Sequence, residues 1–293
     1  MTNIDVLVAV RDEEDSIPVF LERIAALPLP ADVALKVVFI EDSSTDGTRP
    51  LLRRLAATDP SVGYYSLARG FGQGIALTFG MSRSRADAMI MMDVDGSHPP
   101  EAIPELVDGF LDGAQAVQCV RRTLANRRLH RRLGASSFQA LARLVVGVDF
   151  REQNIFFRLI SADVARRILE QPRYWRYLRF PLPRQPEGAL RFVPVDTLER
   201  AHGDSKYGFL RLVNLALDGM LSVLSTKRFM VLGLLAMLFG ALLVVLGFAP
   251  IAVLLALLAL WPLRRFLVLR RRDTLERIEV AECANVPETA GNP

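Results

Sequence analysis

Residues 89–101 read MIMMDVDGSHPPE, and this stretch decides the fold. Its apolar run ends at Met92, and two aspartates, Asp93 and Asp95, follow one residue apart. An apolar run that stops at a cluster of Asp, Gly, Ser and Pro is typical of a buried strand that enters a turn. Two neighbouring carboxylates repel each other unless positive charge lies close to them. The sequence therefore predicts a buried strand with an acidic site at its end.

The residues before this stretch repeat a strand and helix pattern. Strand-like runs lie at 4–10, 35–40, 62–68 and 86–92, and helical stretches between them lie at 16–27, 48–58 and 73–84. Strands that alternate with helices form a mostly parallel, doubly wound sheet, because each helix crosses over to the next strand. The fold class predicted for this part of the chain is therefore α/β.

Acidic and glycine-rich segments follow all four predicted strands. They read RDEED at 11–15, EDSSTDG at 41–47, RGFGQG at 69–74 and DVDGS at 93–97. In open parallel sheets, ligands bind at the carboxyl ends of the strands. We therefore expect the four segments to meet at one edge of the sheet and to form a ligand site.

The Asp-x-Asp pattern at 93–95 favours a divalent cation. Alternate residues of a strand point to opposite faces, but a turn that begins at Asp95 brings both carboxylates to one cleft. Mg²⁺ and Mn²⁺ are hard cations that bind one or two carboxylates together with substrate phosphates. A solvated acidic turn is the alternative interpretation, because Asp-x-Asp alone is a weak signal. The acidic ends of the first two predicted strands favour the metal site.

Apolar residues concentrate towards the C-terminus. The residues at 229–248 carry no charge, and a helix of this length covers about 30 Å of hydrocarbon. A second uncharged run covers 251–263, and a buried core helix is its alternative interpretation. Basic residues precede the first run at 227–228 and follow the second at 264–265 and 270–272. By the positive-inside rule, the two runs predict a transmembrane hairpin with both chain ends in the cytoplasm.

These patterns divide the chain into successive parts. We predict a catalytic domain at 1–206, a juxtamembrane amphipathic helix at 207–226, two transmembrane helices within 227–270 (about 229–248 and 251–269) and a cytoplasmic tail at 271–293. Only two cysteines occur, which speaks against a disulfide framework and favours a reducing compartment. The prediction is an integral protein of a bacterial cytoplasmic membrane whose catalytic domain lies in the cytoplasm.

Several segments, taken in order, resemble family 2 glycosyltransferases, which have a GT-A (Rossmann-like) fold. They read AVRDEEDSI, FIEDSSTDGT, ARGFGQGIALTFGM and MMDVDGSHPPEAIPELV, and the similarity continues through VRRTLANRRLHRRLGASSF, FFRLIS and ERAHGDSKYGFLRLVNLALDG. They look most like the branch that includes dolichyl-phosphate mannosyltransferases and bacterial undecaprenyl-phosphate glycosyltransferases. The resemblance covers most of residues 4–225, and several members of that branch also end in a pair of membrane helices.

The resemblance implies a role for each matched acidic residue. Asp42 would recognise the nucleotide base, with Asp12 and Glu14 nearby. Asp93 would approach the ribose and diphosphate of the nucleotide, or the metal. Asp95 would be the principal ligand of Mg²⁺ or Mn²⁺.

Other matched positions differ from the common family pattern. Ser97 would complete the metal site, where some relatives carry Gln, and its hydroxyl is also suited to cap the helix that follows. Ala9 stands where Pro is usual, and Asp12 stands where Asn is usual. Gly70 and Gln73 replace a common Asn and Lys. These departures concern the details of donor binding and leave the predicted fold unchanged.

An arginine cluster follows the predicted metal site. Six arginines lie within 121–132, and guanidinium groups are suited to bidentate phosphate binding. In the resembling enzymes, arginines and a serine here bind the donor diphosphate and the lipid phosphate. The matched residues are Arg121, Arg132, Ser136 and Arg200. A solvated or membrane-facing basic helix is the alternative, and nucleic acid is not an expected partner because no aromatic side chains are interleaved.

Together these features predict an enzyme. We expect an inverting glycosyltransferase that moves a sugar from a UDP- or GDP-sugar to a polyprenyl phosphate at the cytoplasmic face of the membrane, with Mg²⁺ or Mn²⁺ as cofactor. Two alternatives stay open: a lipid acceptor of the diacylglycerol type, and a non-catalytic GT-A domain that serves as a membrane scaffold. A homo-oligomer is compatible with each of these three functions.

Overall fold

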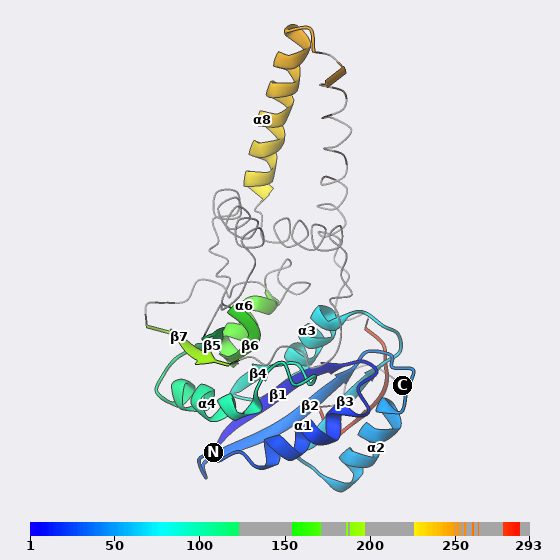
Figure 1. The fold of residues 1–293 in the computed structure, drawn as a ribbon, viewed down its shortest axis with the longest axis vertical. Helices are drawn as coiled ribbons and strands as arrows, with labels where there is room; N and C mark the ends of the chain where they lie inside the picture. The colour runs from blue at the N-terminus through cyan, green and yellow to red at the C-terminus, as the bar shows by residue number, and fades with distance from the viewer. Residues whose placement is uncertain are drawn as a thin grey trace.

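The computed structural model of this chain describes residues 1–122, 154–170, 186, 188–196, 226–248, 250–251, 253, 255, 260, 263 and 278–287. One eight-stranded sheet, of strand order β7-β5-β6-β4-β1-β2-β3-β8, carries helices on both faces (Figure 1). The strands are β1 (Thr2–Val10), β2 (Val33–Glu41), β3 (Val62–Leu67), β4 (Ala88–Met91), β5 (Ala116–Arg121), β6 (Asn154–Ser161), β7 (Leu190–Val195) and β8 (Val280–Ala284). The helices are α1 (Ser16–Ala25), α2 (Thr48–Thr58), α3 (Gln73–Arg83), a 3₁₀ turn η1 (Pro100–Ala102), α4 (Ile103–Leu111), α6 (Ala162–Leu169) and α8 (Thr226–Val245).

The prediction of a mostly parallel α/β sheet is confirmed. β1 pairs in parallel with β2 and with β4, and β2 pairs in parallel with β3, so the carboxyl ends of these four strands lie at one edge. The first three helices and four strands lie where the sequence pattern predicts them, within a few residues at each end. β6 is antiparallel to both β4 and β5, and β7 is parallel to β5.

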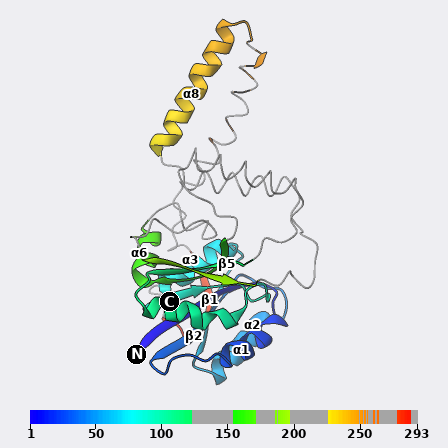
Figure 2. The same cartoon turned by 60° about the vertical axis from the view of Figure 1, so that its left-hand side comes forward.

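Alternating side chains of the sheet form two apolar layers. Val6 and Phe39 point to the layer that α1, α2 and α4 cover, and the Phe39 ring meets Phe20 of α1 edge-on at 6.2 Å. Leu7 and Tyr65 point to the layer under α3 and α6. Because each large apolar side chain contributes about 1.5–3 kcal/mol when it is fully buried, the two layers stabilise the sheet that positions the loops. Both views place α3 and α6 on the side of the sheet turned towards α8 (Figures 1 and 2).

Helix α8 stands away from the sheet in both views (Figures 1 and 2). Its large apolar side chains are exposed, among them Met230, Leu234 and Met237. Among the residues described with their side chains, no helix combines the length and the apolar character needed to cross a membrane. The predicted juxtamembrane helix at 207–226 lies, apart from its last residue, outside the described residues.

The C-terminal region differs from the prediction of a tail at 271–293. Residues Val280–Ala284 form β8, which pairs antiparallel with the outer edge of β3. The sheet therefore includes a strand that lies far beyond residue 206, where we predicted the catalytic domain to end. The short sequence VAECA carries too little periodic pattern to predict a strand, because its strand conformation depends on pairing with β3.

Candidate active site

Four loops follow the parallel strands β1, β2, β3 and β4, and they lie together at one edge of the sheet. They comprise residues 11–15, 42–47, 68–72 and 92–99. The five acids to which the sequence analysis assigns a role all lie in these loops. Hydrogen bonds connect the first loop to the second and the second to the third, and the fourth loop is connected through Asp93 to Gln73 at the start of α3.

The first loop contacts the second through two of the predicted nucleotide-binding acids. The Asp12 carboxylate accepts hydrogen bonds from the Thr45 backbone N–H at 2.6 Å and from the Thr45 hydroxyl at 3.2 Å. The Glu14 carboxylate accepts one from the Gly47 backbone N–H at 2.7 Å. A Cβ at residue 47 would stand 2.1 Å from a Glu14 carboxylate oxygen, so a larger residue here would displace the end of the Glu14 side chain. Both acids are positioned by the backbone of the neighbouring loop.

Asp42 connects the second loop to the third. Its side chain is buried, and its carboxylate accepts hydrogen bonds from the backbone N–H groups of Phe71 at 2.6 Å and Gly72 at 2.8 Å. Gly72 has a φ of 89°, a conformation that favours glycine. An ionised carboxylate has about four acceptor positions, and these two hydrogen bonds use two of them, one on each oxygen. The adjacent Glu41 is fully buried and forms an ion pair with Arg49 at 2.9 Å, which assigns it to the fold.

The Asp-x-Asp loop forms the turn that the sequence predicts. The backbone N–H of Ser97 donates to the Asp95 carboxylate at 3.0 Å, and Gly96 adopts a φ of 77°. Asp95 is exposed, whereas Asp93 is half-buried and accepts a hydrogen bond from the Gln73 side-chain amide. The turn therefore presents Asp95 at the surface of the edge and connects Asp93 to the start of α3.

Glu13 belongs to this acidic group, although the sequence analysis did not single it out. Burial raises the pKa of its carboxyl above the ordinary 4.5, the Ser16 hydroxyl opposes this by donating to the carboxylate at 2.7 Å, and the negative charges of Asp95 and Asp93 raise it further. The available signal was topological: β1 and β4 are neighbours in the sheet, so the loops that follow them lie side by side.

His98 lies between the Asp-x-Asp loop and Phe157 of β6. Its Nδ1 accepts a hydrogen bond from the backbone N–H of Asp93 at 2.8 Å, so the proton of a neutral ring is on Nε2. The ring is buried and stacks on Phe157 of β6 at 5.6 Å. His98 therefore orients the turn that carries the aspartates, and its Nδ1 is already used as an acceptor.

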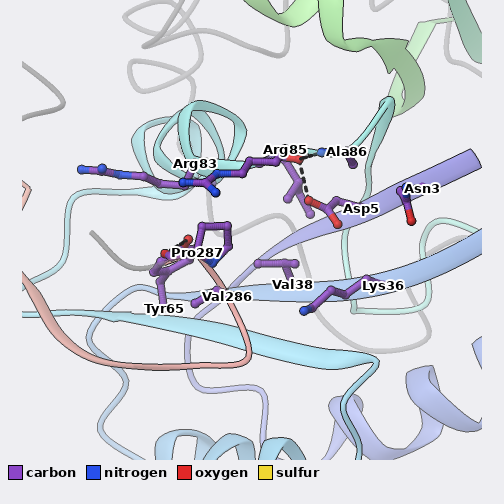
Figure 3. Close-up of a pocket in the computed structure, with 13 residues that line it drawn as sticks. Asn3, Asp5, Lys36, Val38, Tyr65, Arg83, Arg85, Ala86, Val286 and Pro287 are labelled. Atoms are coloured by element: carbon purple, nitrogen blue, oxygen red, sulfur yellow. Dashed lines mark hydrogen bonds between the residues drawn. The ribbon is translucent and has the colours of Figure 1, made fainter. Parts of the chain in front are cut away.

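Two cavities lie at opposite ends of the sheet. One, of about 200 Å³, lies between α1 and the Asp-x-Asp loop, and Ser16, Phe20, Asp95 and His98 are among its lining residues. The other, of about 190 Å³, lies near the amino ends of β1 and β2, where Asn3, Lys36, Arg83 and Arg85 contribute to its wall (Figure 3). Only the first cavity adjoins the acidic loops, so it belongs to the candidate site.

Arg121 is the one predicted phosphate-binding residue within the described residues. It is the last residue of β5 and is exposed. β5 is antiparallel to β6, which is antiparallel to β4, so β5 ends at the same edge as β4. Arg132, Ser136 and Arg200 lie outside the described residues. The structure therefore brings Arg121 to the edge that carries the acidic loops.

No three His, Cys, Asp or Glu side chains in the described part of the chain are arranged to hold one metal ion. The acidic group formed by Glu13, Asp93 and Asp95 supplies oxygen ligands at most one or two at a time. Mg²⁺ is commonly bound in that way, with substrate phosphates completing the coordination. These residues therefore fit a cation that arrives with a phosphorylated ligand.

The chain matches known proteins over most of its length. It is 32% identical over 219 residues to the prophage bactoprenol glucosyl transferase homolog of Escherichia coli strain K12. The aligned residues cover 75% of this chain and 71% of the relative. It is 31% identical over 238 residues to the undecaprenyl-phosphate 4-deoxy-4-formamido-L-arabinose transferase of Pectobacterium carotovorum, covering 79% of this chain and 70% of the relative.

Solved structures share the fold. The glucosyl-3-phosphoglycerate synthase of Mycobacterium tuberculosis in complex with UDP has a TM-score of 0.52 and 20% identity, over 78% of this chain and 80% of that chain. The same enzyme with Mn²⁺, UDP and glucosyl-3-phosphoglycerate gives a TM-score of 0.52 at 19% identity, over the same shares. Residues 5–180 match glycosyl transferase family 2. With its α/β sheet and the acidic loops at one edge, this chain belongs to glycosyl transferase family 2.

Proposed function

We propose that this glycosyltransferase moves a sugar from a nucleotide-sugar donor, UDP- or GDP-linked, to a polyprenyl phosphate and releases a nucleoside diphosphate. The names of the two relatives, one acting on bactoprenol and one on undecaprenyl phosphate, support this acceptor class. The observation that carries the proposal is that three acidic loops, one glycine-rich loop and Arg121 lie at one edge of the sheet. The proposed reaction needs carboxylates that recognise the nucleotide and arginine side chains that bind phosphate, and both kinds of group lie at this edge.

The donor nucleotide would bind at the first two loops. We assign the base to Asp42, whose carboxylate retains acceptor positions, and place Asp12 and Glu14 beside it. Because the backbone of neighbouring loops already orients all three carboxylates, little ordering would remain to be done on binding.

A divalent cation, Mg²⁺ or Mn²⁺, would bind at the Asp-x-Asp loop. Asp95 is the principal ligand in this proposal, with Asp93 and Ser97 beside it and Glu13 adding negative charge. The Mn²⁺ and UDP in the similar solved structure support a metal of this kind. The cation would supply charge neutralisation of the leaving diphosphate, whereas the side chains of the chain orient it.

The acceptor would be bound by arginines. Arg121, at the end of β5, would contact phosphate, together with Arg132, Ser136 and Arg200. A phosphate monoester has a second pKa near 6 and is ionised at neutral pH, so it attacks without a general base. We therefore assign no base to His98, whose Nδ1 accepts the Asp93 N–H. Attack opposite to the leaving group inverts the anomeric carbon.

The membrane would concentrate enzyme and acceptor together. We propose a hairpin of two transmembrane helices at about 229–248 and 251–269, with the catalytic domain on the cytoplasmic side. The exposed apolar side chains of α8 support this part of the proposal, as do the basic residues that flank the two runs. A site at the membrane surface suits an acceptor whose phosphate lies at the level of the lipid headgroups.

The test is the identity of the lipid product. Membranes containing the full-length enzyme would be supplied with a panel of UDP- and GDP-sugars, with either polyprenyl phosphate or diacylglycerol as acceptor. Mass spectrometry is expected to detect a polyprenyl phosphate sugar with at least one donor. A product on diacylglycerol alone, or no product with any donor, would overturn the proposal.

A further inference from the structure

The C-terminal strand β8 packs beside the candidate site. It pairs antiparallel with β3, with Tyr65 opposite Cys283 and Ser66 opposite Glu282. The pairing continues past the end of β3, where the backbone N–H of Ala68 donates to the Glu279 carbonyl at 3.0 Å. β8 thus begins at the carboxyl edge of the sheet, next to the loop that carries Phe71 and Gly72.

A polar cluster holds β8 in place. Both Nε and Nη2 of Arg53, on α2, donate to the Glu282 carboxylate at 2.6 Å, and the Tyr64 hydroxyl donates to the same carboxylate. The Arg53 guanidinium lowers the pKa of Glu282 to about 2. Because this folded-state pKa lies below the ordinary 4.5, the contribution of the pair is present above about pH 4.5 and is lost as the pH falls towards 2.

Shape complementarity adds to these polar contacts. The Asn285 side-chain amide donates to the carbonyl of Ala56 in the last turn of α2 at 2.6 Å and to that of Val62 at the start of β3 at 2.9 Å. A Cβ on Gly63 would stand 2.7 Å from the Asn285 carbonyl oxygen, so the close approach requires glycine. The Tyr65 hydroxyl donates to the Pro287 carbonyl at 2.9 Å, where the C-terminal segment lies against the wall of the second cavity (Figure 3). The fit covers the segment from 279 to 287.

The loop beside β8 and the residue that follows it contact two acids of the candidate site, Asp42 and Asp93. Its Phe71 and Gly72 N–H groups donate to Asp42, and Gln73, which follows, donates to Asp93. Ile278 and Phe71 pack against the same apolar cluster under α3. A displacement of β8 would therefore move the donors that orient Asp42.

We propose that β8 is a positioning element for donor binding: Arg53 and Glu282 fix the strand on β3, and the strand fixes the loop whose N–H groups orient Asp42. This inference rests on the proposed donor-binding role of Asp42. The two residues of the pair are positioning residues, because neither lies at the candidate site itself. Their effect is on the affinity for the nucleotide sugar rather than on the transfer step.

Charge reversal in the full-length enzyme tests the inference. Arg53→Glu and Glu282→Arg are each expected to raise the donor KM roughly three- to tenfold with kcat nearly unchanged. The double variant restores the opposite charges and is expected to return the KM to within about twofold of the wild type. Arg54→Glu, at an exposed neighbouring position on the same helix, is the matched control and is expected to leave the KM unchanged.

Hydrogen–deuterium exchange gives a readout that does not depend on catalysis. Peptides that cover residues 68–72 are expected to exchange faster in Glu282→Arg than in the wild type or in Arg54→Glu, and to recover in the double variant. An unchanged donor KM in both single variants, or a double variant that recovers neither KM nor exchange, would overturn the inference. If the wild type transfers no sugar, the proposed function fails, while the exchange comparison still decides whether β8 orders the loop.

Discussion

The acidic edge has two halves: Asp12, Glu14 and Asp42 form the first, and Glu13, Asp93 and Asp95 form the second. The carboxylates of the two halves have different surroundings. Asp12, Glu14 and Asp42 each accept hydrogen bonds from backbone N–H groups of a neighbouring loop. Glu13 instead lies near Asp93 and Asp95: burial raises the pKa of its carboxyl, and the negative charges of Asp95 and Asp93 raise it further. The first half is formed before any ligand binds, whereas the second would be stabilised by a cation. We infer that nucleotide recognition belongs to the first half and charge neutralisation to the second.

Removal of one negative charge from the second half should reduce turnover more than any other substitution proposed here. Asp95→Asn is expected to reduce turnover by about 100-fold or more, because the principal metal ligand is weakened. EDTA should reproduce the loss in the wild type, and Mg²⁺ or Mn²⁺ should restore activity. Asp32→Asn, an exposed substitution outside the four loops, is the control. Full wild-type activity in EDTA would remove the metal from this account.

The matching change in the first half should act on affinity. Asp42→Asn loses a charge-assisted acceptor for two N–H groups and is expected to raise the donor KM about tenfold. Because residue 42 is buried, the free energy of unfolding should also fall, by about 1–2 kcal/mol. Steady-state kinetics and urea unfolding measure the two quantities. A loss of kcat at constant KM would place Asp42 with the metal half instead.

Substitution of His98 should have a smaller effect on turnover. A general base typically contributes 10²–10⁴-fold to the rate. His98→Ala is expected to keep turnover at pH 8 within about fivefold of the wild type, at a temperature where the variant is folded. Its free energy of unfolding should decrease, since the Asp93 N–H and the Phe157 ring both lose a contact. An inactive variant that still binds donor and metal would make His98 the base.

The smallest of the expected effects is a change in melting temperature when Glu13 is neutralised. Its folded-state pKa is raised, so the wild type loses stability as the pH rises from about 4.5 through that pKa. Without metal, Glu13→Gln is expected to raise the Tm at pH 8 by about 1–3 °C and to leave it unchanged below pH 4.5. Glu22→Gln, exposed on α1, is the control. Equal melting temperatures at pH 8 would show that burial and the charges of Asp95 and Asp93 do not disfavour the ionised Glu13 carboxylate.

The local sequence was sufficient to predict the parts of the fold that depend on short-range patterns. The strand predicted at 86–92, observed as β4 (Ala88–Met91), and the turn at Asp95 follow from apolar runs and from Asp and Gly preferences. β8 depends instead on partners distant in sequence, since Arg53 and Glu282 are 229 residues apart. No local pattern encodes such a pairing.

In the candidate site too, local patterns predict some residues, whereas others depend on neighbours that are distant in sequence. The acids that follow β1, β2 and β4 were identified because each group lies close behind an apolar run. Glu13 was missed because its significance depends on β1 and β4 being neighbours, which the order of elements along the chain does not reveal. The assignments of Arg132, Ser136 and Arg200 rest on the family resemblance and stay predictions.

The stereochemistry of the product tests the central claim most directly. The full-length enzyme would be given an α-linked nucleotide sugar, polyprenyl phosphate and Mg²⁺, and the purified lipid would be analysed by ¹H and ³¹P NMR. Attack by an already ionised phosphate on the face opposite to the leaving diphosphate predicts a β-linked sugar phosphate on the polyprenol. An α-linked product, or a sugar attached to a group other than the lipid phosphate, would contradict the account.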